Sequence, residues 1–164
     1  MKRLTVLSFF LTSLLLTTAC GEESAKREHT PPPGRTLDFT AEVIFLDDSG
    51  EEITTIEAAV ADTDETRTEG LMDVRSLEPY QGMIFIFDDE ARRSFWMANT
   101  PLSLDIIFLN NDLEIVRIHQ NTRPYSQRSI ESERPARYVV EVNAGFSRRH
   151  DLREGMSIRT NPEF

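Results

Sequence analysis

The chain has 164 residues and carries 28 acidic against 18 basic side chains, a net charge of −10 near neutral pH. Because nucleic-acid phosphates demand a basic protein surface, this charge predicts that nucleic acid is not a partner. The length suits one domain with a single core and is too short for two ordinary ones.

The chain begins with the layout of a secretory signal. Two cations, Lys2 and Arg3, precede the apolar run from Leu4 to Leu16, and small residues follow up to Ala19. A membrane-spanning helix needs about 20 apolar residues, and this run is shorter. The pattern therefore predicts an export signal over residues 1–19.

Cys20 is the only cysteine, so no intramolecular disulfide is possible and the exported thiol needs another explanation. Small residues before a Cys at the end of a short apolar run resemble a bacterial lipoprotein box, in which the thiol is acylated and the chain is cut just before it. Several acyl chains on Cys20 would hold the protein on a membrane. Gly21 stands where Asp favours inner-membrane retention in enteric bacteria, so in a host with two membranes we expect the outer one. Ordinary cleavage or a retained anchor is the alternative.

Residues 20–36 predict a disordered, lipidated tether. They contain few apolar side chains and include the run from Pro31 to Pro33, and such a composition does not bury enough apolar surface to fold. Residues 37–164 follow as a single β-rich domain.

That domain opens with a predicted hairpin. Apolar and polar side chains alternate from Leu37 to Phe45, which is the period of a half-buried strand. Turn residues follow from Asp47 to Gly50, and the run from Ile53 to Ala61 returns as the second strand.

A short helix is predicted after the hairpin, with Asp62 as its N-terminal cap, Glu65 completing a capping-box-like pair, and Gly70 at its end. The rest of the domain consists of short strands over 83–87, 94–98, 105–110, 113–119, 137–142 and 156–160, a long polar loop over 121–135 and a helical turn over 144–150. Seven or eight strands with one or two short helices predict an α+β fold that is predominantly β. We expect a compact, barrel-like or strongly curved sheet.

Four separated motifs resemble those of a known family. They are Ala61-Asp62-Thr63 followed by Glu69-Gly70-Leu71-Met72, then Gly82 to Phe87, then Phe95 to Phe108, and finally Arg137 to Gly145. In this order they resemble the bacterial and archaeal family called domain of unknown function 192, over roughly Val60 to Ile158. The family's biochemical activity is not established, so the resemblance implies no reaction. Ala98, Ser103 and Met156 depart from the residues common in the family, and no basic group is expected to act at position 98.

Common catalytic motifs are missing from the chain, which has no phosphate-binding loop, dinucleotide glycine pattern, nucleophile elbow or HExxH sequence. Its three histidines, His29, His119 and His150, have no paired spacing and no nearby carboxylate cluster. We therefore expect neither a metal nor a cofactor.

The segment around Trp96, the only Trp, holds several candidate binding residues. Trp96 is either a core residue, which is the more ordinary role, or the aromatic part of a ligand shelf with Asn99 and Asp105. Asn99 tolerates unusual backbone angles and can cap a turn. Asp105, at the mouth of a buried strand, either accepts backbone amides of that turn or orients a substrate, and for both residues the structural role is the more ordinary.

Glu141 interrupts an apolar run and would be buried if it points inward. Acids are rarely buried without a partner, so an inward Glu141 would need a basic residue, with Arg67, Arg75 and Arg137 as candidates. Tyr138 is either core or pocket wall. The predicted binding residues are Trp96, Asn99, Asp105, Glu141, Arg75 and Tyr138.

These residues favour an envelope-anchored binding or accessory module that recognises a small molecule or peptide, because the aromatic and polar cluster lacks a catalytic nucleophile. An alternative is a hydrolase or lyase in which Asp105 and Glu141 serve as general acid and base. A purely structural envelope lipoprotein is the third hypothesis. If the two carboxylates face one pocket, catalysis is favoured; if turns or ion pairs hold them, binding or structure is favoured.

Overall fold

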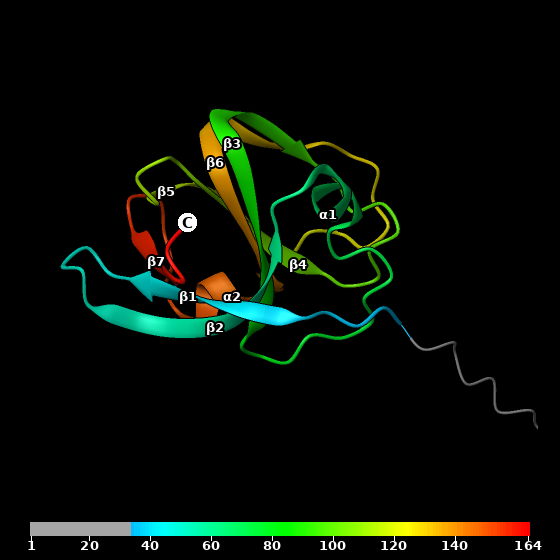
Figure 1. The fold of residues 1–164 in the computed structure, drawn as a ribbon, viewed down its shortest axis with the longest axis horizontal. Coiled ribbons are helices and arrows are strands. Elements are labelled where there is room, and N and C mark those ends of the chain that lie inside the picture. Colours follow the sequence, from blue (N-terminus) through cyan, green and yellow to red (C-terminus); the bar gives the residue numbers. More distant parts are fainter. Residues whose placement is uncertain (1–33) are drawn as a thin grey trace, which may run out of the picture. The chain divides into compact units, whose positions relative to one another are not determined.

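The computed structural model describes residues 34–164 (Figure 1). The predicted export signal, the acylation site at Cys20 and the tether up to Pro33 lie outside the described residues. Neither helix within residues 34–164 is long and apolar enough to cross a membrane.

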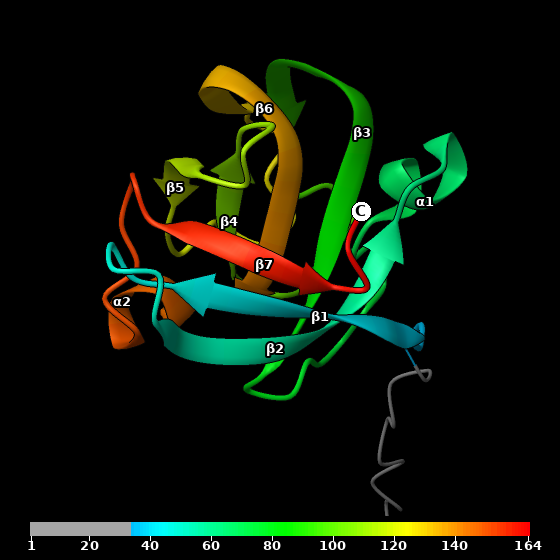
Figure 2. The same cartoon turned by 60° about the vertical axis from the view of Figure 1, so that its left-hand side comes forward.

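Seven strands and two short helices form the described domain (Figures 1 and 2). The strands are β1 (Phe39–Leu46), β2 (Glu52–Ala61), β3 (Gln81–Phe95), β4 (Leu104–Leu109), β5 (Ile115–His119), β6 (Ile130–Asn143) and β7 (Ser157–Asn161). The helices are α1 (Asp64–Glu69) and α2 (Phe146–Arg149). The predicted α+β class with predominant β structure is confirmed.

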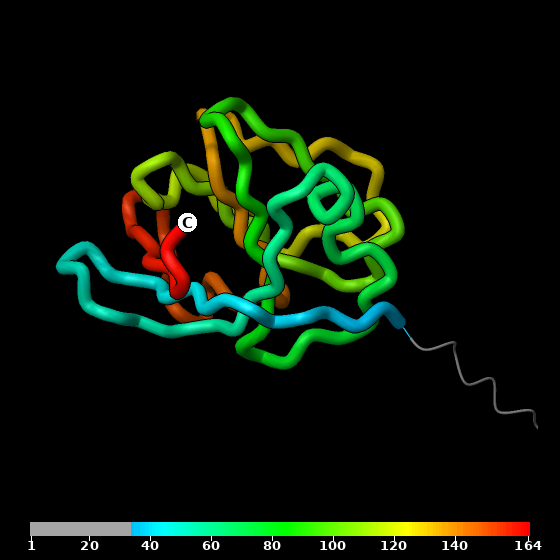
Figure 3. The backbone as a smooth tube through the Cα atoms, viewed as in Figure 1, coloured from blue at the N-terminus to red at the C-terminus, as the bar shows by residue number. Residues whose placement is uncertain are grey.

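The strands form one sheet in the order β5-β4-β6-β3-β2-β1-β7, in which β2 and β3 pair in parallel and the other neighbours are antiparallel. The sheet curls until its edges meet, as the backbone trace also shows (Figure 3). The Ile115 amide donates to the carbonyl of Met156 at 2.7 Å, and the Ile158 amide donates to the carbonyl of Leu113 at 3.0 Å. These bonds join the β5 and β7 sides, so the predicted barrel-like curvature is confirmed and few strand edges stay open.

The interior of the curled sheet holds the first of two cores. Alternate residues of the strands pack there around Phe45 and Phe146, whose ring centroids lie 5.6 Å apart. The sheet also needs a glycine at position 82, because a Cβ there would lie 2.4 Å from the carbonyl oxygen of Glu141. Gly82 therefore allows β3 to approach β6 closely.

The second core lies on the outer face of the sheet, beneath α1 and the turn that follows it. It contains Leu71, Phe85, Met97, Ile106 and Val139, all of them buried. This outer core forms the base of the cavity described below.

Two predicted boundaries in the middle of the domain are wrong. Residues 94–98 do not form a separate strand, because β3 runs unbroken to Phe95 and pairs with β6 along its length, with register shifts. The predicted loop over 121–135 ends earlier, since β6 begins at Ile130. Pro135 is accommodated within β6 beside one of those shifts, where the hydrogen-bond ladder is interrupted anyway.

The predicted cap of α1 is also wrong by one residue. The Thr63 hydroxyl accepts the Thr66 amide at 3.2 Å, and the Thr66 hydroxyl accepts the Thr63 amide at 3.0 Å. Thr63 is therefore the N-terminal cap, in place of Asp62, while Gly70 ends the helix as predicted.

Arg35 extends the domain into the segment assigned to the tether. Its backbone amide donates to the carbonyl of Asp73 at 3.0 Å, and its guanidinium donates to the carbonyls of Gly70 and Met72. Arg35 thus holds the turn after α1 against the rest of the domain.

Candidate functional site

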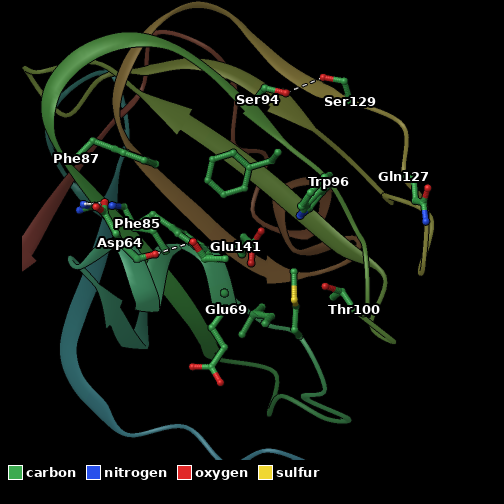
Figure 4. A pocket seen from close by; sticks show the side chains of 16 residues that line it. Asp64, Glu69, Phe85, Phe87, Ser94, Trp96, Thr100, Gln127, Ser129 and Glu141 are labelled. Carbon is green, nitrogen blue, oxygen red and sulfur yellow. Dashed lines mark hydrogen bonds and ion pairs between the residues drawn. The ribbon is translucent and has the colours of Figure 1, made fainter.

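A cavity of about 520 Å³ opens on the outer face of the sheet (Figure 4). Its walls come from α1 and the following turn, from β3, and from the loops after β3 and before β6. The lining residues are Asp64, Arg67, Thr68, Glu69, Gly70, Leu71, Met72, Phe85, Phe87, Ser94, Phe95, Trp96, Thr100, Gln127, Ser129 and Glu141.

Glu141 forms part of this lining from the centre of the sheet. It lies on β6 between Met83 of β3 and Ile106 of β4, so both of its cross-strand neighbours are apolar. Only 4% of the residue is exposed. Burial raises the pKa of Glu141 to about 8, because an ionised carboxylate loses its hydration there. The carboxyl group therefore carries a proton at neutral pH.

None of the three predicted arginine partners pairs with Glu141. Arg67 lines the cavity, but its guanidinium donates to the carbonyls of Asp62 and Ile86 and to the Asp64 carboxylate, each at 2.7 Å. The other two candidates do not line the cavity: Arg137 donates to the carbonyl of Phe87 and to Asn111, and Arg75 is exposed. The prediction of an ion pair is wrong because the sheet surrounds Glu141 with apolar neighbours.

Trp96 lines the opening of the cavity with 58% of its surface exposed, so the core interpretation is wrong. The chain leaves β3 after Phe95, and the buried position falls to Met97 instead. In Figure 4 Trp96 and Phe87 lie on opposite sides of the view, with Glu141 between them.

Asp105 is buried but does not line the cavity. Its carboxylate accepts the amides of Asn121 at 2.9 Å, Gly145 at 3.1 Å and Ser147 at 2.9 Å. It pairs with Val142 in the sheet and therefore points into the interior core, away from the face of Glu141. The carboxylate has a structural role, but it accepts the amide of Asn121 in the loop after β5 and two amides at the start of α2, and not those of the Asn99 turn.

Asn99 and Tyr138 also lie away from the cavity lining. Asn99 has a φ of 57°, and its carbonyl accepts the Asp73 amide at 2.9 Å, so it shapes the turn that supports the cavity wall. Tyr138 is buried in the interior core, with its hydroxyl 3.5 Å from the carbonyl of Phe164. Of the six predicted binding residues, only Trp96 and Glu141 line the cavity.

Sequence reasoning missed most of the aromatic wall. Phe85 and Phe87 belong to the predicted strand over 83–87, and their spacing of two residues does indicate a shared face. The missing information was that this face is the one that carries Glu141. The polar loop before β6 contributes Gln127 and Ser129 to the lining. The polar composition of this loop is the one feature of the sequence that indicates a place in a binding site.

Side chains able to hold a metal ion do not gather in the described domain. Within residues 34–164, no group of three or more His, Cys, Asp or Glu side chains is suitably placed. The cavity therefore offers aromatic surface, hydroxyl and amide groups, and one unpaired carboxyl.

Comparisons with known proteins place this arrangement in a family. A protein from Sinorhizobium meliloti 1021, named as a candidate transcription regulator, has a similar crystal structure, with a TM-score of 0.72 and 31% identity over 77% of this chain and 98% of that chain. A protein of unknown function from Novosphingobium aromaticivorans DSM 12444 gives a TM-score of 0.68 and 30% identity over 71% and 82% of the two chains. No curated protein matches the sequence. The model of the DUF192 family, described as Uncharacterized ACR, matches residues 43–160, and the chain therefore belongs to the DUF192 family.

Proposed function

We propose that this protein is a binding module of the cell envelope that takes a small molecule, or one end of a peptide, into the cavity over Glu141. One observation carries the proposal: a buried carboxyl without an ion pair opens onto a cavity walled by aromatic rings. An unpaired buried acid costs stability, and such costs are typical of positions kept for function.

The size and lining of the cavity support this function. Ligand pockets commonly enclose roughly 300 to 1,000 Å³ and combine apolar walls with a few polar groups, and the cavity of about 520 Å³ falls in that range. Phe85, Phe95 and Trp96 supply aromatic area, while Ser94 and Ser129 offer hydroxyl groups at the edge. Aromatic surface provides affinity, and the polar groups fix the orientation of the ligand.

The emission of Trp96 provides the test, because it is the only Trp of the chain. A ligand that enters the cavity should change the Trp96 fluorescence in a panel of small metabolites and short peptides. Binding detected by calorimetry should be lost in Trp96→Ala and kept in Tyr80→Ala, which removes an aromatic ring of similar exposure, 52% against 58%, outside the cavity. Ligands that bind both variants equally would contradict the proposed site.

The envelope location is a separate part of the proposal. It is supported by the signal-like start and by the single cysteine at position 20. Labelled fatty acid should be incorporated into the wild-type protein and not into Cys20→Ser, and the variant should leave the membrane fraction. Incorporation that persists in the variant would contradict the anchor.

A second candidate function is acid catalysis, which is favoured by a carboxyl that keeps its proton at neutral pH. Asp105 does not serve as the matching base because it faces the interior core, so that role would fall to Asp64 or Glu69 in the cavity wall. A hydrolase or lyase would convert a compound that binds, and Glu141→Gln would still bind it without converting it. Binding without conversion favours the first candidate.

The description of the Sinorhizobium protein as a candidate transcription regulator is not part of the proposal. Residues 20–164 hold 16 Arg and Lys against 28 Asp and Glu, and an acidic surface repels the phosphates of DNA. Tight, salt-dependent binding of duplex DNA would contradict this view.

A further inference from the structure

We propose that the ligand of the Glu141 cavity is an organic ammonium ion, held between the carboxylate of Glu141 and the faces of Trp96 and Phe85. This inference rests on the proposed binding function and names the chemical class of the ligand. It follows from the charges, the rings and the donors that the structure brings to the cavity.

Of the acidic side chains in the cavity wall, Glu141 is the one without a basic partner among residues 34–164. Asp64 pairs with Arg67 at 2.7 Å, and Glu69 lies 3.5 Å from Arg35, so each of these acids has a basic neighbour. Glu141 has no basic neighbour among residues 34–164, and its burial alone raises its pKa. A ligand with one positive charge would therefore supply the partner that the protein itself does not.

The rings of the wall also favour a cation. The guanidinium of Arg93 lies 4.0 Å from the Phe87 ring centroid, and that of Arg67 lies 5.4 Å from the same centroid. Phe87 is thus already covered by cations of the protein. Trp96 and Phe85 have no such neighbour in the described domain, and an ammonium group over an aromatic face is stabilised by the ring quadrupole.

Other classes of ligand find fewer partners. An anion would depend on Arg67, which among the described residues is the only basic side chain of the lining, and that guanidinium already makes three hydrogen bonds. A metal ion would need several carboxylate, imidazole or thiolate ligands, and residues 34–164 do not group them. A neutral ligand that accepts a hydrogen bond from protonated Glu141 is the remaining competitor, and the experiment below separates it from a cation.

Binding of a cation requires Glu141 to lose its proton. When a permanently charged ammonium ion binds at neutral pH, the carboxyl O–H bond breaks and the proton passes to solvent; an uncharged amine would instead take up that proton itself. The other titratable groups around the cavity are Asp64, Arg67 and Glu69. His119 lies on the same sheet face, beyond Ile106, and the strand neighbours of Glu141 are apolar.

The test compares each ammonium probe with a neutral molecule of the same shape: choline with 3,3-dimethylbutan-1-ol, and benzylammonium with benzyl alcohol. Calorimetry at pH 7 in buffers of different ionisation enthalpy should show release of about one proton per choline bound, and affinity should rise about tenfold per pH unit up to about pH 8 and then level off. Each cation should bind at least about tenfold more tightly than its neutral counterpart at pH 8, because only the cation pairs with the carboxylate.

Variants assign the effect to Glu141. Glu141→Gln should abolish both the proton release and the preference for the cation. Glu65→Gln, which makes the same substitution at an exposed position of α1 outside the lining, should keep both. Thermal unfolding of both variants provides the check that they fold.

Two results would overturn the inference. If the neutral probes bind as tightly as the cations and Trp96→Ala abolishes the binding of both, the cavity is a binding site but does not select ammonium ions, and the proposed function stands without the inference. If none of the four probes changes the Trp96 emission at millimolar concentration, the inference also fails. In that case the wider panel of metabolites and peptides decides on the proposed function by itself.

Discussion

Glu141 and Asp105 are two buried acids on neighbouring strands, and the pleat of the sheet gives them opposite roles. Asp105 points into the interior core, where three backbone amides satisfy its carboxylate. Glu141 points to the outer face, where its cross-strand neighbours are Met83 and Ile106. Asp105 therefore stabilises the fold, and Glu141 places an unpaired carboxyl in the lining of the cavity.

The pH dependence of stability should reveal the burial of Glu141. Because burial raises its pKa from 4.5 to about 8, its contribution to folding is complete below pH 4.5 and is lost as the pH rises to about 8. Glu141→Gln should match the wild type near pH 4.5 and be more stable at pH 7 by about 3 kcal/mol. Urea unfolding between pH 4.5 and 9 measures this difference, and curves that stay parallel over that range would contradict it. Glu65→Gln is the matched control.

Removal of the Asp105 carboxylate should destabilise the domain without abolishing the binding of a ligand in the cavity. Asp105→Ala leaves the partly buried amides of Asn121 and Gly145 and the buried amide of Ser147 without their acceptor, which should lower the free energy of unfolding by roughly 2 to 3 kcal/mol. Asp105→Asn keeps one acceptor oxygen and should lose less. Chemical denaturation measures both values. The more stable variant should bind any cavity ligand as the wild type does, because Asp105 is not part of the lining; loss of binding in folded Asp105→Asn would show a second role.

At the scale of the elements, the cavity depends on short segments that the sheet holds in place. The turn after α1 carries Gly70, Leu71 and Met72 into the lining. Arg35 binds two carbonyls of this turn, and the carbonyl of Asn99 accepts the amide of Asp73. The wall is thus positioned by backbone contacts from distant parts of the chain.

Substitutions at Asn99 should depend on backbone conformation more than on side-chain chemistry. Asn99 has a φ of 57° and an exposed side chain. Asn99→Gly should keep the stability within about 0.5 kcal/mol, because glycine adopts this conformation readily. Asn99→Val should cost about 1 to 2 kcal/mol, since a β-branched residue is strained there. Thermal unfolding compares the two, and equal losses would indicate that the Asn side chain itself is required.

At the scale of the whole domain, the curled sheet has an inner and an outer face, and each face carries its own hydrophobic core. The interior core fills the curled sheet around Phe45 and Phe146. The outer core supports α1 and the cavity. Substitutions in the cavity wall should therefore leave the packing of the interior core unchanged.

The start of the folded domain can be located by shortening the chain. A protein that begins at Gly34 should melt within a few degrees of one that begins at Gly21, because the composition of residues 21–33 does not favour folding. A protein that begins at Leu37 should melt several degrees lower, since it loses the contacts of Arg35 with Gly70, Met72 and Asp73. Calorimetry measures all three, and equal melting temperatures would show that the Arg35 contacts contribute little.

Several features of this protein were determined by the sequence itself. Alternating polarity and turn residues predicted the first hairpin and most of the strands, and glycine at position 70 predicted the end of α1, because these features depend on neighbours within a few residues. The two acids within apolar runs, Asp105 and Glu141, were recognised as unusual for the same local reason.

Only the tertiary structure decided which of these residues meet. Register places Glu141 beside Ile106 and Asp105 beside Val142, and a shift of one residue would exchange their faces. The cavity collects side chains from α1, β3, β6 and two loops, which lie far apart along the chain. Such long-range pairing is set by closure of the sheet and by packing over its outer face, and no local pattern of residues specifies it.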